Sequence, residues 1–262
     1  MTTAPRPEVV AIIPARLGST RFPGKVLADA TGKPLIQHVW ESTKRAASLS
    51  RVVIATDDQR VMAAAKQFGA ESVLTSPEHP NGTSRLAEAA STLGLAREAV
   101  VVNVQGDEPE LDPSVIDDSV AALLRSEPDG GAIATAATPM GPTERPDDPN
   151  VVKVALAANG FALYFSRSRI PFDRDGTGKN GGGGGPQCLR HIGLYVYRRS
   201  TLERYAAMPP TPLETVEKLE QLRALENGLK IAVATVRPEA TGGGGIDTPE
   251  QYQAFTRRIL TK

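Results

Sequence analysis

The chain has 262 residues, and its 30 basic and 30 acidic side chains cancel, so it carries no overall field that would hold a nucleic acid or an acidic membrane surface. Its single cysteine, Cys188, excludes an intramolecular disulfide and multi-cysteine zinc sites, and no stretch approaches the roughly 20 apolar residues of a membrane span. The composition therefore predicts a soluble cytoplasmic protein that binds no nucleic acid and does not insert into a membrane.

Short apolar runs alternate with longer amphipathic segments in the first half of the chain. Strands are expected at 9–13, 51–56, 71–75 and 99–104, and helices at 35–47, 58–68 and 85–93. Asp57 and Asp58 are expected to start the second of these helices. Strands that are apolar on both faces and separated by helices indicate a largely parallel sheet covered on both sides. The first half is thus predicted to be a doubly wound α/β fold.

The second half is less regular and is expected to add antiparallel strands to the sheet. Asn159-Gly160 lies between two alternating runs, which is typical of a hairpin. Further elements are expected as a strand at 190–197, a helix at 212–227, a strand at 230–236 and a helix capped by Thr248. Leucine or valine recurs every third residue at 213, 216, 219, 222 and 225 and is expected to face the core. No linker separates two cores, so residues 1–262 are predicted to form a single domain.

The segment PARLGSTRFPGK at 14–25 follows the first expected strand. A glycine-punctuated basic loop in this place offers backbone N–H groups and fixed positive charge to an anion, usually a phosphate. The alternative is a solvated loop with ordinary surface charge, but ligands of doubly wound sheets bind at the carboxyl ends of strands. Lys25 is followed by Val26, so the P-loop consensus is not met. A second loop, HPNGTSR at 79–85, is either a capping loop or a nucleotide contact.

Two carboxylates are candidates for a metal site. Asp107 ends the apolar run VVNVQGD, at the same edge of the sheet as the basic loop, where it is well placed to hold Mg²⁺ on phosphate oxygens. The alternative is an aspartate that only caps the next turn. Asp247, in GGGGIDTPE, is the second carboxylate, although either it or Thr248 could simply be a helix N-cap.

A third candidate site combines a strand and a helix. His191, Gly193 and Tyr195 alternate along RHIGLYVY and so point to one face, which is polar enough to touch a hydroxylated ligand. A lone histidine on a strand is more often a structural residue. Glu220 and Gln221 lie in the expected helix at 212–227, where the alternative is that they are solvated.

The ordered motifs together resemble the cytidylyltransferase family nearly from end to end. They are IIPARLGSTRFPGK, ATDD, HPNGTSRLAE, VNVQGDEP, YFSRSRIPF, RHIGLYVYR, KLEQLRALENG and GIDTPE. The resemblance implies a nucleotide-diphospho-sugar transferase type of fold. It also implies transfer of CMP from CTP to the anomeric hydroxyl of 3-deoxy-D-manno-octulosonate (Kdo), with Mg²⁺ and release of pyrophosphate. A cytoplasmic homodimer that serves lipopolysaccharide assembly is implied as well.

The resemblance also implies roles for residues that match the motifs. By position these are Arg16, Arg21, Lys25 and Arg85 for the nucleotide, Arg16, Lys25 and Asp107 for catalysis, Asp107 and Asp247 for Mg²⁺, and Gln105, His191, Tyr195, Glu220 and Gln221 for the sugar. A sugar-binding and dimerisation subregion is expected around 140–230. Ser84 departs from the acidic residue usual in the family, and the glycine run 181–185 replaces a more varied loop.

Two alternatives to the leading interpretation are carried forward. One is a cytidylyltransferase for another acidic sugar, such as a sialic acid or 8-amino-Kdo. The other is a non-catalytic nucleotide-binding protein that kept the fold. Arg16 and Lys25 occur together with the two candidate metal carboxylates, Asp107 and Asp247. This favours an enzyme, because a binding module would not need two metal ligands. The roles of the glycine runs 181–185 and 242–245 stay open.

Overall fold

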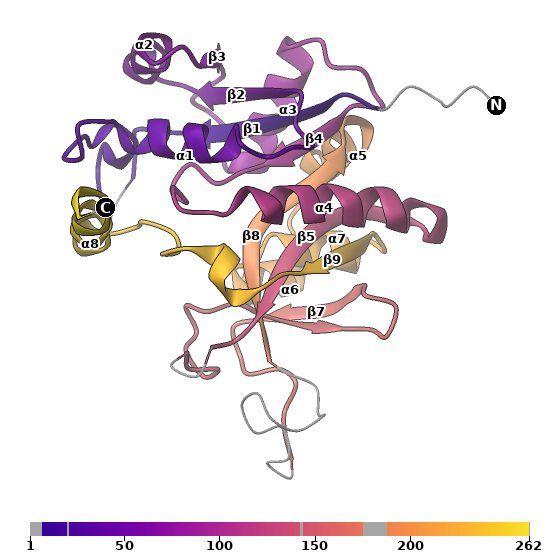
Figure 1. The fold of residues 1–262 in the computed structure, drawn as a ribbon. Helices are drawn as coiled ribbons and strands as arrows, with labels where there is room; N and C mark the ends of the chain where they lie inside the picture. Colours follow the sequence, from indigo (N-terminus) through magenta and orange to yellow (C-terminus); the bar gives the residue numbers. More distant parts are fainter. Residues whose placement is uncertain (1–6, 20, 142–143, 175–187, 262) are drawn as a thin grey trace.

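The computed structural model describes residues 7–19, 21–141, 144–174 and 188–261. Within these residues a nine-stranded sheet forms the centre of the molecule, with helices packed on it (Figure 1). The strands are β1 (Val9–Ala15), β2 (Arg51–Thr56), β3 (Glu71–Leu74), β4 (Val100–Asn103), β5 (Gly131–Pro139), β6 (Lys153–Leu156), β7 (Ala162–Ser166), β8 (Leu189–Arg198) and β9 (Lys230–Thr235). The helices are α1 (Leu35–Thr43), α2 (Gln59–Gln67), α3 (Gly82–Thr92), α4 (Pro113–Ser126), α5 (Arg199–Ala206), α6 (Pro212–Glu217), α7 (Gln221–Glu226) and α8 (Pro249–Leu260).

The order of the strands confirms the predicted doubly wound, mostly parallel sheet with antiparallel additions. The main path is β3-β2-β1-β4-β8-β5-β9, and β6 and β7 lie beside it, with β6 paired to β8. Strands β1 to β4 pair in parallel, as do β5 and β9, whereas β8 runs antiparallel to both β4 and β5. The strand order reverses direction between β1 and β4. This is the switch point at which such sheets bind their ligands.

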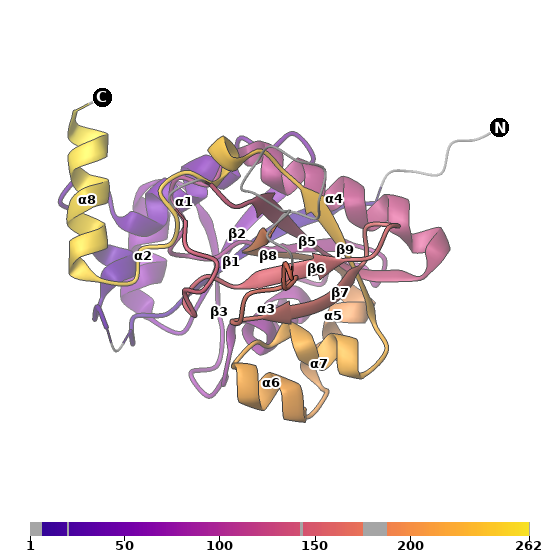
Figure 2. The same cartoon turned by 90° about the horizontal axis from the view of Figure 1, so that it is seen from below.

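The apolar side chains of the sheet divide between two cores, one on each face. Helices α1, α2 and α4 cover one core, and α3, α5 and α7 cover the other. Helix α8 stands at the edge of the molecule (Figure 2) and packs Tyr252 and Phe255 against Leu35 of α1. The Tyr252 hydroxyl also accepts a hydrogen bond from the Ala30 backbone N–H at 2.8 Å. The last helix is therefore attached to the region that follows the basic loop.

The predicted hairpin around Asn159-Gly160 is present. Strands β6 and β7 are antiparallel on either side of it, and Gly160 takes a positive φ of 82° that suits glycine. After β7 the chain leads to the glycine run 181–185, which lies outside the described residues.

The single helix predicted at 212–227 is wrong, because the segment forms two short helices. Lys218 breaks it with a left-handed φ of 54°, and α7 begins after it. Leu219 and Leu222 are buried as predicted, but Leu213 is 41% and Val216 is 81% exposed. The break turns α6 outward, so its apolar residues do not join the core.

Three further elements, α4, β5 and α5, were not predicted. Helix α4 has an ordinary start signal, since the Asp112 side chain accepts a hydrogen bond from the Ser114 N–H and proline follows at the first helical position. Strand β5 has the sequence GAIATAATP, whose alanines have low strand propensity. It becomes a strand because β8 and β9 pair with its two edges and most of its residues are buried in the sheet.

Candidate active site

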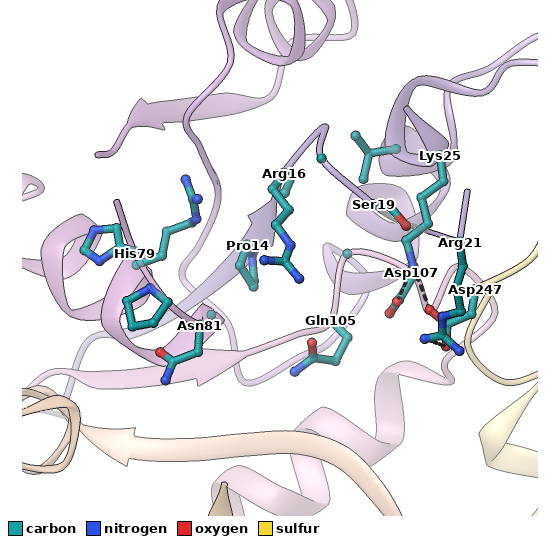
Figure 3. Close-up of a pocket in the computed structure, with 17 residues that line it drawn as sticks. Pro14, Arg16, Ser19, Arg21, Lys25, His79, Asn81, Gln105, Asp107 and Asp247 are labelled. Carbon is teal, nitrogen blue, oxygen red and sulfur yellow. Dashed lines mark hydrogen bonds and ion pairs between the residues drawn. The ribbon is translucent and has the colours of Figure 1, made fainter. Parts of the chain in front are cut away.

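A cavity of about 470 Å³ opens at the switch point, at the carboxyl ends of β1 and β4 (Figure 3). Its wall consists of the basic loop after β1, the segment that leads into α3, the turn after β4, and Asp247 just before α8. This volume lies in the range of small-molecule sites, and the place is the one at which doubly wound folds bind ligands. The structure thus brings together segments from the first, middle and last parts of the chain.

The basic loop is held in shape by its own backbone. The Leu17 carbonyl accepts hydrogen bonds from the N–H groups of Ser19 and Gly24, both at 3.0 Å, and Gly24 has a positive φ of 72°. Gly106, after β4, passes so close to this loop that a Cβ atom there would lie 2.6 Å from the Pro14 carbonyl oxygen. Only glycine allows this approach. The loop is therefore fixed against the turn that carries Asp107, and Lys25 follows at its end.

Lys25 joins the two predicted metal carboxylates. Its ammonium donates to Asp107 Oδ2 at 2.7 Å and to Asp247 Oδ1 at 3.0 Å (Figure 3). It also donates to the Ile246 carbonyl at 2.9 Å. Arg21 forms an ion pair with the other oxygen of Asp247 at 2.9 Å. Asp247 does not cap α8, because Thr248 does so by accepting a hydrogen bond from the Gln251 N–H. The carboxylate of Asp247 is thereby left for the cavity.

The three oxygen atoms that contact the Lys25 ammonium fit a magnesium ion as ligands, both in kind and in number. Asp107 Oδ2, Asp247 Oδ1 and the Ile246 carbonyl all lie within 3.0 Å of one point, the Lys25 ammonium. All are oxygens, and Mg²⁺ is usually bound through one or two carboxylates while waters and substrate phosphates complete its shell. Among the described residues no group of three or more histidine, cysteine or acidic side chains could hold a metal. A fully protein-bound ion is therefore not built there, whereas a shared ion fits.

The two remaining nucleotide-side cations differ in their surroundings. The Arg16 side chain points into the cavity and makes no hydrogen bond or ion pair with any described residue (Figure 3). Arg85 is 3% exposed, and its guanidinium donates to Asp57 Oδ2 and Thr75 Oγ1, both at 2.7 Å. Arg16 is thus free to meet an anion, and Arg85 forms a fixed part of the wall. The helix-start role expected for Asp57 belongs to Asp58 alone, which accepts a hydrogen bond from the Arg60 N–H.

The segment HPNGTSR caps a helix, which is one of the two alternatives left open for it, and it also lines the cavity. Asn81 caps α3 by accepting a hydrogen bond from the Ser84 N–H at 2.9 Å, so the helix begins at Gly82, earlier than predicted. His79 and Asn81 also line the cavity, together with Pro14 and Ser19, which the sequence did not single out. The sequence indicated these residues only through their positions in the loops 14–25 and 79–85.

Among the predicted sugar-side residues, Gln105 lines the cavity and donates to the Gly193 carbonyl on β8 at 3.0 Å. The other four do not line this cavity. His191 and Tyr195 share a face of β8 as predicted, with ring centroids 5.5 Å apart. Burial lowers the pKa of His191 to about 3, with a further lowering by Arg190, so the ring is neutral at physiological pH. Gln105 therefore connects the cavity to the β8 strand that carries them.

Glu220 and Gln221 stand at the start of α7. Gln221 is 5% exposed, and Glu220 is close enough to Tyr195 that its charge adds to burial in raising the pKa of that phenol. Burial also raises the pKa of Glu220 itself. The predicted alternative of solvated side chains is therefore wrong for Gln221, and the break at Lys218 places the pair near the polar face of β8.

Glu108 is a further acidic residue that sequence reasoning missed. Its pKa is raised to about 7, chiefly by burial and then by the charges of Asp107 and Asp247, while Arg190 acts in the opposite direction. Its signal was its place in the QGDEP turn beside Asp107. Glu108 thus lies near the two carboxylates of the cavity, although it does not line the cavity itself.

Comparison with known proteins places these features in context. The family model described as "Cytidylyltransferase" matches residues 10–231. The 3-deoxy-manno-octulosonate cytidylyltransferase of Geobacter sulfurreducens is 47% identical over 256 residues, covering 96% of this chain and 99% of that protein. The enzyme of that name from Pseudomonas syringae pv. syringae is 48% identical over 251 residues, with 95% and 96% covered.

Solved structures show the same likeness. A CMP:2-keto-3-deoxy-manno-octonic acid synthetase complexed with CTP has a TM-score of 0.86 and 35% identity, covering 97% of this chain and 99% of that one. A 4-diphosphocytidyl-2C-methyl-D-erythritol synthase has a TM-score of 0.61 at 12% identity, covering 98% and 100%, and shows the fold alone. None of the described helices is both long enough and apolar enough to cross a membrane.

Proposed function

Because the chain belongs to the cytidylyltransferase family, we propose that it transfers CMP from CTP to Kdo and releases pyrophosphate, as a nucleotidyltransferase. The observation that carries this function is the cavity at the switch point, where Arg16, Lys25, Asp107 and Asp247 meet. A solved relative with 35% identity over nearly the whole chain is a CMP:2-keto-3-deoxy-manno-octonic acid synthetase complexed with CTP. A non-catalytic nucleotide-binding protein is disfavoured, because such a protein would not need two carboxylates at this place.

The reaction joins the anomeric oxygen of Kdo to the α-phosphorus of CTP. The bond from that phosphorus to the bridging oxygen breaks, pyrophosphate leaves with the electron pair, and the hydroxyl proton is released. Catalysis of phosphoryl transfer depends on positioning and on stabilisation of spreading negative charge. Arg16, which is unpaired among the described residues, and Lys25 would contact the triphosphate, with Arg21 at the mouth of the cavity. Arg85, fixed by Asp57, would contact the nucleoside side.

Asp107 and Asp247 would hold Mg²⁺. The ion, when bound, would neutralise the triphosphate and polarise its oxygens. The chain's own contribution is to hold both carboxylates at one point, Asp107 on the turn after β4 and Asp247 in front of the capped start of α8. Gln105 would lie between the nucleotide and the sugar, and His191, Tyr195, Glu220 and Gln221 would then surround the sugar acid beyond it.

A pyrophosphate-release assay tests the function. The purified protein should release pyrophosphate from CTP when both Kdo and Mg²⁺ are present, and EDTA should abolish the release. A sialic acid, 8-amino-Kdo and a reaction without sugar serve as controls. Pyrophosphate release with a control sugar but not with Kdo would support the proposed reaction and assign it a different sugar substrate. No release with any sugar would contradict an enzymatic role.

We further propose that the protein is a cytoplasmic homodimer that associates through the 140–230 subregion. Three strongly exposed apolar side chains occur in this part of the chain, namely Leu163 on β7 at 63%, Phe172 just after it at 82% and Val216 on α6 at 81%. Ser166 at the end of β7 donates to Glu217 of α6 at 2.6 Å, so these elements are tied together. Interaction surfaces typically contain large exposed apolar side chains, which supports this part of the chain as the interface.

The mass in solution tests the dimer. Light scattering should give twice the 27.8 kDa of one chain, and Phe172→Glu should shift the protein toward the monomer. Leu260→Glu on α8, a residue 65% exposed outside the subregion, is the matched control and should leave the mass unchanged. A wild-type protein of single-chain mass would contradict the proposal.

A further inference from the structure

The Lys25 ammonium is fully engaged by oxygen atoms at the edge of the cavity. It has three N–H donors and three acceptors, Asp107 Oδ2 at 2.7 Å, the Ile246 carbonyl at 2.9 Å and Asp247 Oδ1 at 3.0 Å. Its side chain is only 12% exposed. In this arrangement the lysine is turned toward the carboxylates, and no donor of its ammonium is left over for a phosphate.

The Lys25 ammonium stands between the two carboxylates that would hold a metal ion. It contacts both Asp107 and Asp247, so a divalent cation held by the same carboxylates would compete with it. Arg21 pairs with the remaining oxygen of Asp247 at 2.9 Å. Lys25 and Arg21 therefore balance the charges of Asp107 and Asp247. A divalent cation that entered without nucleotide would find the space between the two carboxylates occupied and their charge already neutralised.

A triphosphate would change this balance. It would bring several negative charges into a cavity in which Lys25, Arg16 and Arg21 all take part in the wall. A lysine side chain is a flexible point charge, and it can turn between acceptors on either side of its stem. Once the ammonium faces phosphate oxygens, Asp107 loses its ion pair with Lys25 and Asp247 keeps only the one with Arg21, so that both carboxylates become available as ligands for a metal.

We propose that Lys25 is the resident cation of the metal site in the nucleotide-free protein, so that a divalent metal binds strongly only together with the nucleotide. This inference rests on the proposed function and concerns the order in which the site is filled. In the nucleotide-free protein, Lys25 holds Asp107 and Asp247 at the correct separation. When nucleotide and metal bind, its ammonium moves to the triphosphate.

Binding of Mn²⁺ as a probe, without any turnover, tests the proposal. Free Mn²⁺ is measured by electron paramagnetic resonance with nucleotide-free wild type, Lys25→Met, and Lys25→Met combined with Asp107→Asn. Lys25→Met should bind Mn²⁺ at least about tenfold more tightly than wild type, because Asp107 loses its counter-ion and Asp247 loses one of its two. The double variant should lose this gain. Lys33→Met, which removes an exposed lysine paired with Glu41, is the matched control and should bind like wild type.

The coupling between metal and nucleotide gives a second readout. The affinity for CTP, measured with and without Mn²⁺ and with no sugar present, should depend on Mn²⁺ more strongly in wild type than in Lys25→Met, because coupling between two ligands is reciprocal. Mn²⁺ binding to Lys25→Met that equals or falls below wild type would overturn the proposal. So would a gain that persists in the double variant, since the metal would then be held elsewhere. Pyrophosphate release by the wild type tests the proposed function separately.

Discussion

Replacing Asp107 with asparagine should lower kcat by roughly two to three orders of magnitude and leave the fold intact. The amide keeps the size of the side chain but supplies a neutral oxygen, which is a poor ligand for Mg²⁺. It also removes the 2.7 Å ion pair with Lys25. Loss of a metal ligand that stabilises transition-state charge costs several kcal/mol, which sets the expected size of the effect. Steady-state pyrophosphate release with CTP and Kdo, over a range of Mg²⁺ concentrations, measures it.

The same chemical change elsewhere provides the control for this variant. Asp118→Asn alters an exposed aspartate of α4 that has no described partner, and it should retain full turnover. Circular dichroism and urea unfolding of both variants should match the wild type, since neither residue is part of a core. Near-normal turnover of Asp107→Asn, with an unchanged requirement for Mg²⁺, would show that the metal is held by other residues.

Lys153→Met should lower the free energy of unfolding by about 2 to 4 kcal/mol. Lys153 on β6 is 0% exposed, and its ammonium donates to the backbone carbonyls of Asp148 at 2.9 Å, Val151 at 2.6 Å and Arg167. Methionine fills a similar volume but removes one donor from each of the three carbonyls, of which only that of Asp148 keeps another, the Val151 N–H at 3.1 Å, among the described backbone hydrogen bonds. Burial of the ammonium has its own cost, seen in the lowered pKa of Lys153, so the expected loss is smaller than the sum of three buried hydrogen bonds. Urea unfolding at pH 7 measures the difference.

Lys230→Met is the matched control for this second prediction. Lys230 on β9 is exposed, and its ammonium donates to one carbonyl, that of Asp129, at 2.7 Å. Because water can replace that contact, the variant should stay within about 0.5 kcal/mol of the wild type. If Lys153→Met were equally mild, the carbonyl contacts would do no more than offset the cost of burying the charge.

The site could be predicted where its chemistry lies within continuous segments. The loop 14–25 and the turn that carries Asp107 can be recognised from their own sequences, because each follows an apolar strand and contains glycine and charged residues. Their convergence follows from the parallel topology, which brings the carboxyl ends of β1 and β4 together. Asp247 was recognised as a candidate carboxylate, but its local sequence fits a helix cap equally well, and only the resemblance favoured the metal role.

Contacts between distant residues could not be predicted in this way. The pairing of Arg85 with Asp57 depends on how α3 packs against β2, and the three carbonyls around Lys153 come together only when β6 and β7 are folded. The break at Lys218 is likewise invisible to periodicity, because leucines and valines continue through it at regular spacing. Such features are set by tertiary packing, which overrides local propensity.

Helix α8 makes the proposed chemistry depend on the far end of the chain. Of the two carboxylates proposed to hold the metal, Asp247 is the one that comes after the last described strand, and it is held in place because Tyr252 and Phe255 anchor α8 beside α1. A chain that stopped after β9 would contain every described strand and most of both cores. Such a chain would show the secondary structure of a folded protein in its spectrum, and yet it would lack Asp247, one of the two carboxylates proposed to hold the metal. The proposed catalysis therefore requires α8 in addition to the sheet, because this helix anchors the segment that carries Asp247.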